Sequence, residues 1–144
     1  MIGLASEAHH PWLAGHGVIP VAYGDGMADR IRQAASKMDA FIDTFGAGYV
    51  QLALELGVEP SRIDTIADFE AAAKYGVKTD GGTAAGPGAR VLAELAALIA
   101  DGQLEVPIAN VYPLTQVREA YTELERRHTR GKIVLRPGQD RSST

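Results

Sequence analysis

The sequence predicts an α/β protein with one doubly wound, mainly parallel sheet and helices on both of its faces. Short β-rich runs alternate with helical patterns, and four strand–helix steps follow one another in the first half of the chain. A later segment carries one continuous apolar stripe at helical spacing. The chain has 144 residues, 46% of them hydrophobic, which is enough for one sizeable core. We therefore expect one domain over residues 1–136 and a disordered polar tail over residues 137–144.

The first half of the chain is expected to alternate strands with helices. The predicted strands cover residues 2–5, 18–22, 38–43 and 62–67, and the helices that follow them cover residues 8–14, 27–35, 49–56 and 69–74. Pro11 suits the first turn of the first helix, where its missing N–H does no harm. Asp25 and Asp68 stand where the N-cap residue of a helix is expected.

The second half begins with a glycine-rich stretch. Gly76 to Thr79 is expected to form a short strand, and Gly81 to Gly88 a loop too flexible for a regular element. The apolar stripe lies on the helix predicted over residues 89–100, which Gly102 should end. The stripe consists of Val91, Leu92, Leu95, Leu98 and Ile99.

The last elements are an extended segment, a helix and a strand. Residues 104–111 are expected to be extended, with Pro107 at a break or an edge position. The helix predicted over residues 114–127 should bury Val117, Ala120, Tyr121 and Leu124. A final strand, Ile133 to Leu135, then closes the sheet.

Charge and cysteine content exclude several classes of function. The formal net charge of −4 argues against a nucleic-acid partner, which needs a clustered basic surface. Four basic residues do cluster, at Arg126, Arg127, Arg130 and Lys132, but Glu119, Glu123 and Glu125 precede them, so we expect a solvated, ion-paired helix face. The chain has no cysteine, which excludes disulfides and thiolate metal sites. Neither a targeting segment nor a membrane span is apparent, so the expected location is cytoplasmic, with no membrane partner.

The end of the chain carries the most specific pattern. Tyr112-Pro113-Leu114, the run from Val117 to Tyr121 and the run from His128 to Leu135 indicate a helix leading into a final strand. This ending resembles the C-terminus of the medium-chain dehydrogenase/reductase superfamily, in particular its zinc-free, NADPH-dependent quinone oxidoreductase branch. The resemblance implies a truncated, Rossmann-like cofactor-binding domain over residues 1–136. The first strand, the Gly-rich loop and the catalytic barrel domain of such enzymes would come before Met1.

Ligands of an open parallel sheet bind beyond the carboxyl ends of its strands. By the resemblance, Ser6 lies in the turn that meets the adenosine ribose, where a hydroxyl selects the 2′-phosphate of NADPH. Glu7 would oppose that phosphate, so NADH remains possible. Tyr23 resembles the aromatic residue beside the adenine; the alternative is an ordinary half-buried strand tyrosine.

Two later turns correspond, by the resemblance, to those that flank the nicotinamide and its ribose. The candidate cofactor-binding residues in these turns are Asp43, Thr44, Ile66, Ala67 and Asp68. The alternative for Asp43 and Asp68 is that each caps the helix behind it. Lys132 could approach a phosphate, or it could cap the helix before it.

Catalytic and metal-binding patterns are absent from the sequence. No strand is followed by G-x-G-x-x-G, the turn that cradles a pyrophosphate. The adjacent His9 and His10 cannot point at one metal centre, and no carboxylate pair has a defined separation. We therefore assign no catalytic residue and no metal.

The resemblance implies hydride transfer from NADPH to a quinone or an activated alkene, a small-molecule substrate. The isolated chain is expected to be inactive. The alternative is a non-catalytic, stand-alone dimerising remnant that does not bind cofactor. In either case we expect a homodimer through the edge strand at Gly76 to Thr79, because an unpaired strand edge is a template for pairing.

Overall fold

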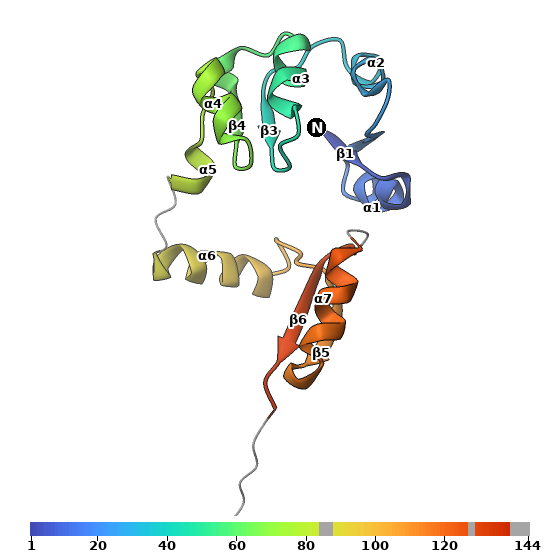
Figure 1. Ribbon diagram of the computed structural model, residues 1–144, viewed down its shortest axis with the longest axis vertical. Helices are drawn as coiled ribbons and strands as arrows, with labels where there is room; N and C mark the ends of the chain where they lie inside the picture. Colours follow the sequence, from blue (N-terminus) through green and yellow to red (C-terminus); the bar gives the residue numbers. More distant parts are fainter. Residues whose placement is uncertain (84–87, 127–128, 139–144) are drawn as a thin grey trace, which may run out of the picture. The chain divides into compact units, whose positions relative to one another are not determined.

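The computed structural model of the chain describes residues 1–83, 88–126 and 129–138 (Figure 1). It divides into two compact units, unit 1 over Met1–Gly88 and unit 2 over Ala89–Thr144. Of the tail expected over residues 137–144, residues 139–144 lie outside the described residues. No helix in the described ranges is long and apolar enough to cross a membrane.

Unit 1 contains the strand–helix steps that the first half of the sequence predicts. Its strands are β1 (Ile2–Ala5), β2 (Ile19–Ala22), β3 (Phe41–Asp43) and β4 (Ile63–Thr65). Its helices are α1 (His10–Gly15), α2 (Met27–Ala34), α3 (Tyr49–Glu55), α4 (Phe69–Tyr75) and α5 (Asp80–Thr83), with 3-10 turns η1 (Glu7–His9) and η2 (Pro60–Arg62). Every strand and helix predicted over residues 1–75 is therefore confirmed, with ends that differ by a few residues.

The strands of unit 1 pair in parallel, as the α/β prediction requires. β1 pairs with β2, and β3 pairs with β4. The short strand expected at Gly76 to Thr79 is reduced to one parallel bridge between Lys78 and Asp64. The Lys78 N–H donates to the Ile63 carbonyl at 2.9 Å, and the Thr65 N–H donates to the Lys78 carbonyl at 3.0 Å. Within the described residues no ladder joins the β1–β2 pair to the β3–β4 pair.

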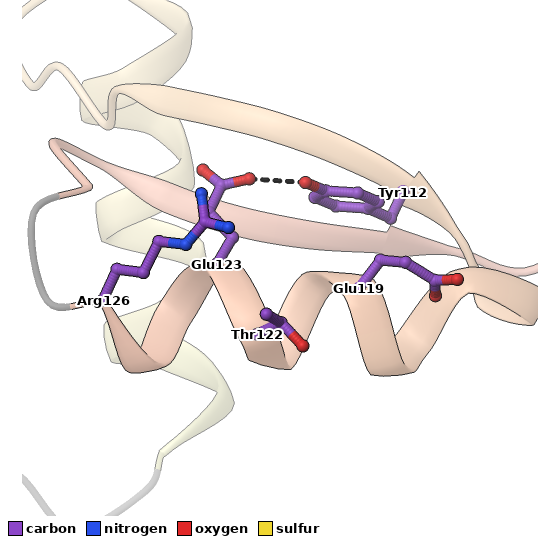
Figure 2. A pocket seen from close by; sticks show the side chains of 5 residues that line it. All are labelled: Tyr112, Glu119, Thr122, Glu123 and Arg126. Atoms are coloured by element: carbon purple, nitrogen blue, oxygen red, sulfur yellow. Dashed lines mark hydrogen bonds between the residues drawn. The ribbon is translucent and has the colours of Figure 1, made fainter.

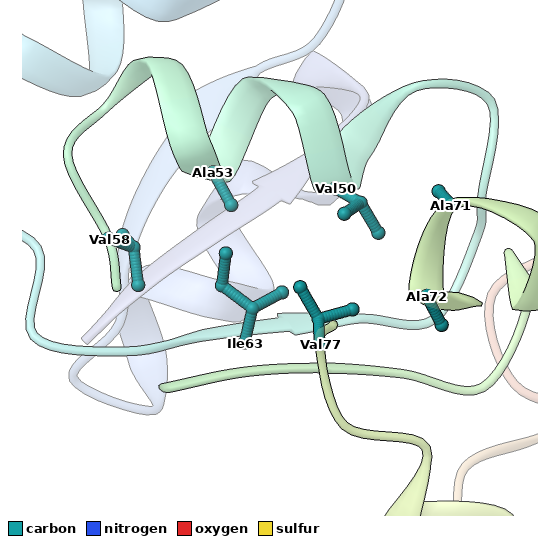
Figure 3. Packing of buried hydrophobic residues seen from close by; sticks show 7 residues of the cluster. All are labelled: Val50, Ala53, Val58, Ile63, Ala71, Ala72 and Val77. Atoms are coloured by element: carbon teal, nitrogen blue, oxygen red, sulfur yellow. The ribbon is translucent and has the colours of Figure 1, made fainter. Parts of the chain in front are cut away.

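One hydrophobic cluster packs α3 and α4 against β4 (Figure 3). Ile63 and Val50 are fully buried at its centre, and burying an Ile or Val side chain contributes about 1.5–3 kcal/mol. The cluster consists of Val50, Ala53, Val58, Ile63, Ala71, Ala72 and Val77. The small alanines of α3 and α4 allow these helices to approach the strand closely. The cluster thereby fixes the carboxyl ends of β3 and β4.

A second cluster extends the core to the other strand pair. Val21 of β2, Ile31 of α2 and Leu52 of α3 form its buried centre. Ile2 and Leu4 of β1 and Phe41 of β3 are half-buried against it, among other residues. The two strand pairs of unit 1 therefore share one core although no ladder connects them.

Two local predictions for unit 1 are wrong. Asp25 does not cap α2: the N-cap is Gly26, with φ 74°, and no side chain completes the cap. Gly81 does not begin a loop but lies in the one-turn helix α5, while residues 84–87 of that predicted loop lie outside the described residues. The Gly81 backbone packs so closely on Ile66 that an added Cβ would lie 2.7 Å from the Ile66 Cγ2 atom. This close packing leaves no room for a side chain at position 81.

Unit 2 contains the remaining predicted elements. They are α6 (Ala89–Ala100), β5 (Ile108–Pro113), the 3-10 turn η3 (Leu114–Gln116), α7 (Val117–Glu125) and β6 (Lys132–Arg136). The bounds of α6 match the prediction, and Gly102, with φ 68°, ends the helix as expected. There the Gln103 and Leu104 N–H groups donate to the Leu98 carbonyl at 2.9 and 3.0 Å.

α7 connects β5 to β6, which pair in parallel. Ala120 is buried, as predicted. The predicted burial of Tyr121 and Leu124 is wrong, because these side chains are 59% and 53% exposed. A pair of strands is narrower than the full sheet that the prediction assumed, so it covers less of the apolar face of the helix.

Candidate functional site

The candidate site of unit 1 lies in the turns that follow its four strands. In a parallel sheet these turns all leave from the carboxyl ends of the strands, where ligands of such folds bind. Ser6 follows β1, Tyr23 follows β2, Thr44 follows β3 and Ile66 follows β4. Seven of the eight predicted site residues belong to unit 1. The exception is Lys132.

Asp43 is the last residue of β3, and its side chain is only 2% exposed. Its Oδ1 atom accepts hydrogen bonds from the backbone N–H of Phe45 at 2.9 Å and of Gly46 at 2.8 Å. Its Oδ2 atom accepts a hydrogen bond from the Thr65 hydroxyl at 2.8 Å. The carboxylate therefore closes the turn behind its own strand and links that turn to β4.

Thr65 performs the same task for the turn after β4. Its side chain is fully buried, and its Oγ1 atom accepts hydrogen bonds from the N–H groups of Ala67 at 3.2 Å and Asp68 at 3.0 Å. The hydroxyl proton goes to Asp43. The sequence predictions did not include Thr65, and only the register that pairs Asp43 with Thr65 across β3 and β4 reveals its role.

The Asp43–Thr65 network leaves a specific set of groups on the surface. Phe45 is 67% exposed and Ile66 is 47% exposed, and Thr44 and Ala67 are exposed beside them. Ala67 lies against the other turn, because a Cβ added at Gly46 would be 3.5 Å from the Ala67 Cβ atom. The buried polar groups therefore shape the turns, while small and apolar side chains form their outer surface.

Helix capping was the alternative role for both Asp43 and Asp68, and only Asp68 has it. The Oδ1 atom of Asp68 accepts a hydrogen bond from the Ala71 N–H at 2.9 Å, so Asp68 is the N-cap of α4 as predicted. Asp43 does not cap the helix behind it, because the N-cap of α3 is Gly48. Three residues of positive φ, Ala47 among them, separate Asp43 from that helix and keep its carboxylate within its own turn.

Ser6 lies between β1 and η1, outside any helix, as its predicted place in a turn requires. Its Oγ atom is 3.4 Å from the Nδ1 atom of His9. His10 turns to a different partner, the Ala5 carbonyl, with its Nε2 atom at 3.3 Å. The described part of the chain contains no group of three or more His, Cys, Asp or Glu side chains that could hold a metal ion.

Arg30 shapes the turn after β2, where Tyr23 lies 51% exposed. Its Nε and Nη2 atoms donate to the Ala22 carbonyl at 3.1 and 2.9 Å. Its Nη1 atom donates to the Asp25 carbonyl at 2.7 Å, and Nη2 also reaches the carbonyls of Tyr23 and Gly24, both at 3.3 Å. The guanidinium is thus held by the backbone carbonyls of four consecutive residues, Ala22 to Asp25. No sequence signal separates such an arginine from an ordinary one on a helix.

Tyr49, in the first turn of α3, links the turns after β2 and β3. Its ring meets the Phe45 ring edge-on, with centroids 5.8 Å apart. Burial raises the pKa of the Tyr49 hydroxyl, and Asp43 and then Tyr23 raise it further by their charge. Tyr49 therefore stays protonated, with an O–H group available as a donor beside the two turns.

Lys132 opens β6 in unit 2, so the structure does not group it with the other seven candidates. Its backbone N–H donates to the Pro107 carbonyl at 2.8 Å. The predicted capping of the preceding helix is wrong, because Lys132 is a strand residue paired with Ile108.

Unit 2 has a shallow hollow of about 270 Å³ between β5 and α7 (Figure 2). Glu123 lies at its centre and accepts a 2.5 Å hydrogen bond from the Tyr112 hydroxyl. The Asn110 side-chain amide donates to both carboxylate oxygens of Glu123, at 2.7 and 2.9 Å. These bonds, that from Tyr112 first, lower the pKa of Glu123, and the same bond to Glu123 raises the pKa of Tyr112. The polar groups of the hollow therefore bond to one another, and the bonds from Asn110 and Tyr112 to Glu123 connect β5 to α7.

The fold and the turns at the strand ends define a Rossmann-like α/β domain of the dinucleotide-binding type. The family model described as zinc-binding dehydrogenase matches residues 16–135. The chain belongs to this family. No curated protein matches it.

Three solved structures, of two alcohol dehydrogenases and an enoyl reductase, are similar in fold. An NAD-dependent alcohol dehydrogenase is 20% identical in sequence, with a TM-score of 0.69. The match covers 95% of this chain and 43% of the chain of that dehydrogenase. A putative alcohol dehydrogenase from Sinorhizobium meliloti 1021 is 18% identical, with a TM-score of 0.70 over 95% and 41%. The enoyl reductase CurK is 18% identical, with a TM-score of 0.66 over 94% and 46%. The chain thus spans less than half the length of these proteins.

Neither the zinc of the family name nor a complete dinucleotide cradle fits the residues present. The chain has no cysteine, and the described residues lack a ligand cluster for a metal. The turns after β1 to β4 offer a hydroxyl, aromatic rings and backbone groups. None of them has the G-x-G-x-x-G spacing that binds a pyrophosphate.

Thr65→Val should destabilise unit 1 and loosen both turns. The change keeps the side-chain shape but removes one donor to the buried Asp43 carboxylate and the acceptor for two N–H groups. We expect a loss of about 2–4 kcal/mol in the free energy of unfolding. Urea denaturation measures this loss, and amide exchange at Phe45 to Asp68 localises it. Thr65→Ser, which keeps the hydroxyl, and Thr44→Val, at an exposed position, should stay within about 1 kcal/mol of wild type. Equal losses in Thr65→Val and Thr65→Ser would contradict the role of the hydroxyl.

The stability of unit 2 should depend on the ionisation of Glu123 and Tyr112. The folded pKa of Glu123 is lowered, so its contribution is present above the ordinary value of 4.5 and is lost as the pH falls through the folded pKa. The folded pKa of Tyr112 is raised, so its contribution is present below the ordinary value of 10.0 and is lost as the pH rises through the folded pKa. Urea unfolding at a series of pH values, followed by the NMR signals of β5 and β6, measures the loss of stability at low pH and at high pH.

Glu123→Gln should flatten the acid limb of that profile, because the group that titrates is gone. Glu125→Gln, an exposed position on the same helix, is the matched control and should keep the wild-type profile. If Glu123→Gln left the loss of stability at low pH unchanged, another carboxyl group would be its cause.

Proposed function

We propose that the chain is the C-terminal, cofactor-binding portion of a zinc-free, NAD(P)H-dependent oxidoreductase that transfers hydride to a quinone or an activated alkene. The observation that carries this proposal is the match to the zinc-binding dehydrogenase family over residues 16–135. The name of the similar enoyl reductase supports the activated alkene of the two acceptors. No step of the proposal needs zinc.

The proposed cofactor lies across the turns that follow β1 to β4. Ser6 and Tyr23 hold the adenosine part, with the Ser6 hydroxyl as a donor to a 2′-phosphate. The turns closed by Asp43 and Thr65 hold the nicotinamide part, where Phe45, Ile66 and Ala67 offer an apolar surface. The bound cofactor supplies the hydride, and the protein supplies position and electrostatics.

NADPH should bind the isolated chain weakly and only at these turns. No described turn supplies the backbone donors that a pyrophosphate needs, and hydrogen bonds to charged groups contribute roughly 1.5–3 kcal/mol each, so several decades of affinity are lost. An NMR titration should shift the amides of Ser6, Tyr23, Phe45 and Ala67. Shifts confined to the hollow ahead of β3 and β4, around Lys37 and Glu59, would contradict the proposed site. Micromolar affinity would contradict the need for a separate pyrophosphate turn.

The preference for NADPH is tested by Ser6→Ala in the same titration. The substitution should weaken NADPH more than NADH, because only NADPH carries a 2′-phosphate for the hydroxyl to meet. Thr44→Ala, an exposed hydroxyl after a different strand, should affect both cofactors alike. Equal effects of Ser6→Ala on the two cofactors would remove Ser6 from this role.

We also propose that the chain forms a homodimer through the segment Gly76 to Thr79. The backbone N–H and carbonyl of Lys78 are already bonded to β4. A second copy of the chain would therefore pair with the opposite edge of the segment. The closely buried Val77 side chain, 8% exposed, holds the segment in place. Sedimentation equilibrium at tens of micromolar should show a dimer. A monomer at that concentration would contradict the proposal.

A further inference from the structure

An aspartate followed by glycine is the dipeptide at which a backbone nitrogen most readily attacks the preceding side chain, because glycine has no Cβ to hinder the approach. All the aspartates that precede a glycine in this chain are exposed. These pairs are Asp25-Gly26, Asp80-Gly81 and Asp101-Gly102. The sequence alone makes the three pairs equivalent, so only their backbone environments separate them.

The pairs at Asp80 and Asp101 lie in backbone that is held in place. The Gly102 N–H donates to the Ile99 carbonyl at 3.1 Å, so its nitrogen is already engaged. Gly81 lies in helix α5, and its backbone packs against Ile66 with no room for a side chain. Either glycine nitrogen therefore reaches the preceding carboxyl group only after the local structure opens.

The turn after β2 leaves the third pair open. No group among the described residues accepts a hydrogen bond from the Gly26 N–H or bonds to the Asp25 carboxylate. Both residues are exposed, and Gly26, with φ 74°, precedes the first residue of α2. The Gly26 nitrogen and the Asp25 carboxyl group therefore have no partner to give up before they meet.

The guanidinium of Arg30 lies against the peptide bond that joins these two residues. Its Nη1 atom donates to the Asp25 carbonyl at 2.7 Å, and a Cβ added at Gly26 would lie 3.3 Å from the same atom. A donor on the carbonyl draws charge from the amide nitrogen, which makes the Gly26 N–H more acidic. A fixed cation also stabilises the negative charge that develops on this peptide during the reaction.

We propose that Asp25-Gly26 is a site of spontaneous isomerisation, at which Arg30 directs the product toward isoaspartate. In the first step the Gly26 nitrogen loses its proton to water and bonds to the side-chain carboxyl carbon of Asp25, which loses its hydroxyl as water. In the second step a water adds to the main-chain carbonyl carbon of the succinimide ring, and the bond from this carbon to the Gly26 nitrogen breaks. The side chain then carries the peptide link, and the former main-chain carbonyl is a carboxylate. The first step releases one water and the second consumes one.

The carbonyl that Arg30 holds decides which bond the second step breaks. Attack of water on the side-chain carbonyl carbon of the ring restores aspartate, whereas attack on the main-chain carbonyl carbon gives isoaspartate. The Nη1 atom of Arg30 donates to the main-chain oxygen, where it would stabilise the oxyanion that this attack creates. The new carboxylate then lies beside the guanidinium, and a charge-assisted hydrogen bond stabilises the product. Isoaspartate therefore accumulates at residue 25.

Isoaspartate lengthens the main chain by one atom between β2 and α2. Arg30 also holds the carbonyls that precede Asp25, those of Ala22, Tyr23 and Gly24. The longer turn cannot keep the four carbonyls around one guanidinium. The conversion therefore loosens the turn after β2 and the start of α2.

Incubation of the whole 144-residue chain at physiological temperature and neutral pH, in water enriched in heavy oxygen, tests the site. Hydrolysis of the succinimide places a heavy oxygen in either product, so peptide mapping by mass spectrometry counts the aspartate and the isoaspartate formed at each pair. Isoaspartate should form at residue 25 at least about tenfold faster than at residues 80 and 101. In urea, where the folded environments are lost, the three rates should lie within about threefold of one another. Similar rates in the folded chain, or a faster reaction at residue 80 or 101, would overturn the proposal.

Arg30→Gln tests the directing role in the same experiment. The ratio of labelled isoaspartate to labelled aspartate at residue 25 should fall at least about threefold, because a neutral amide stabilises the oxyanion less than a guanidinium does. The ratio compares two products of one intermediate, so it reports the direction of hydrolysis even if the variant turn opens more often. Residue 101, in unit 2, is the internal control and should keep its ratio. The wild-type ratio at residue 25 should fall similarly in urea, which removes the contact without a substitution. An unchanged ratio in urea or in the variant would overturn the role of Arg30.

Asp25→Glu gives the matched control for the structural effect. It keeps the charge of the exposed side chain but would need a larger ring, so it should not isomerise. The N–H groups of Met27 and Arg30 bond to the Gly24 and Gly26 carbonyls at 3.0 and 3.2 Å, and their amide exchange should speed up at least about tenfold in the isomerised wild-type chain. Incubated Asp25→Glu should keep the exchange rates of fresh protein. Faster exchange in both chains, or unchanged exchange in wild type that contains isoaspartate, would contradict the loosening of the turn.

Discussion

The hydrogen bond from Thr65 to Asp43 is the interaction on which the turns after β3 and β4 of unit 1 depend. It joins the ends of two neighbouring strands, and each partner then closes the turn behind its own strand. A carboxylate that is 2% exposed is tolerable only because three donors reach its two oxygens. The same burial makes the network strong, since each unmade bond would leave a buried charge without a partner. The shape of both turns therefore follows from one buried pair, and the packing of Ile63 beneath it holds that pair in register.

The network also decides which groups remain for a ligand. The Asp43 carboxylate and the Thr65 hydroxyl are used to shape the backbone, as is the guanidinium of Arg30 after β2. After β3 and β4, the exposed side chains of the two turns are apolar or weakly polar: Thr44, Phe45, Ile66 and Ala67. Such a surface orients a flat, uncharged ring and provides little charge of its own. This agrees with the proposed function, in which the bound cofactor supplies the hydride and the protein supplies position.

Sequence reasoning succeeded where the physical cause is local. The cap formed by Asp68 acts over three residues and the turn at Gly102 over at most six, so both could be predicted from residue type and position. It failed where the cause depends on register or packing. Thr65 acts on Asp43 across 22 residues, and nothing in either residue type states that their strands pair. Likewise Asp25 was a plausible cap until Gly24 and Gly26 took positive φ and turned its carbonyl to Arg30. The helical spacing of Tyr121 and Leu124 predicts burial only if a full sheet covers the helix, and β5 and β6 form a pair of strands.

The charges of the turns after β1 to β4 limit how these turns could hold the proposed cofactor. The turns contain the acidic residues Glu7, Asp25 and Asp68 and no lysine or arginine, and Asp43 stands at the end of β3. Arg30 reaches the turn after β2 but donates to backbone carbonyls. A dinucleotide carries phosphates, so at these turns their compensation has to come from backbone N–H groups and a helix N-terminus rather than from basic side chains. None of the turns has the G-x-G-x-x-G spacing that provides such groups. The acidic side chains and the absence of that spacing therefore act in the same direction, and both would weaken the binding of a phosphate-bearing cofactor by this chain.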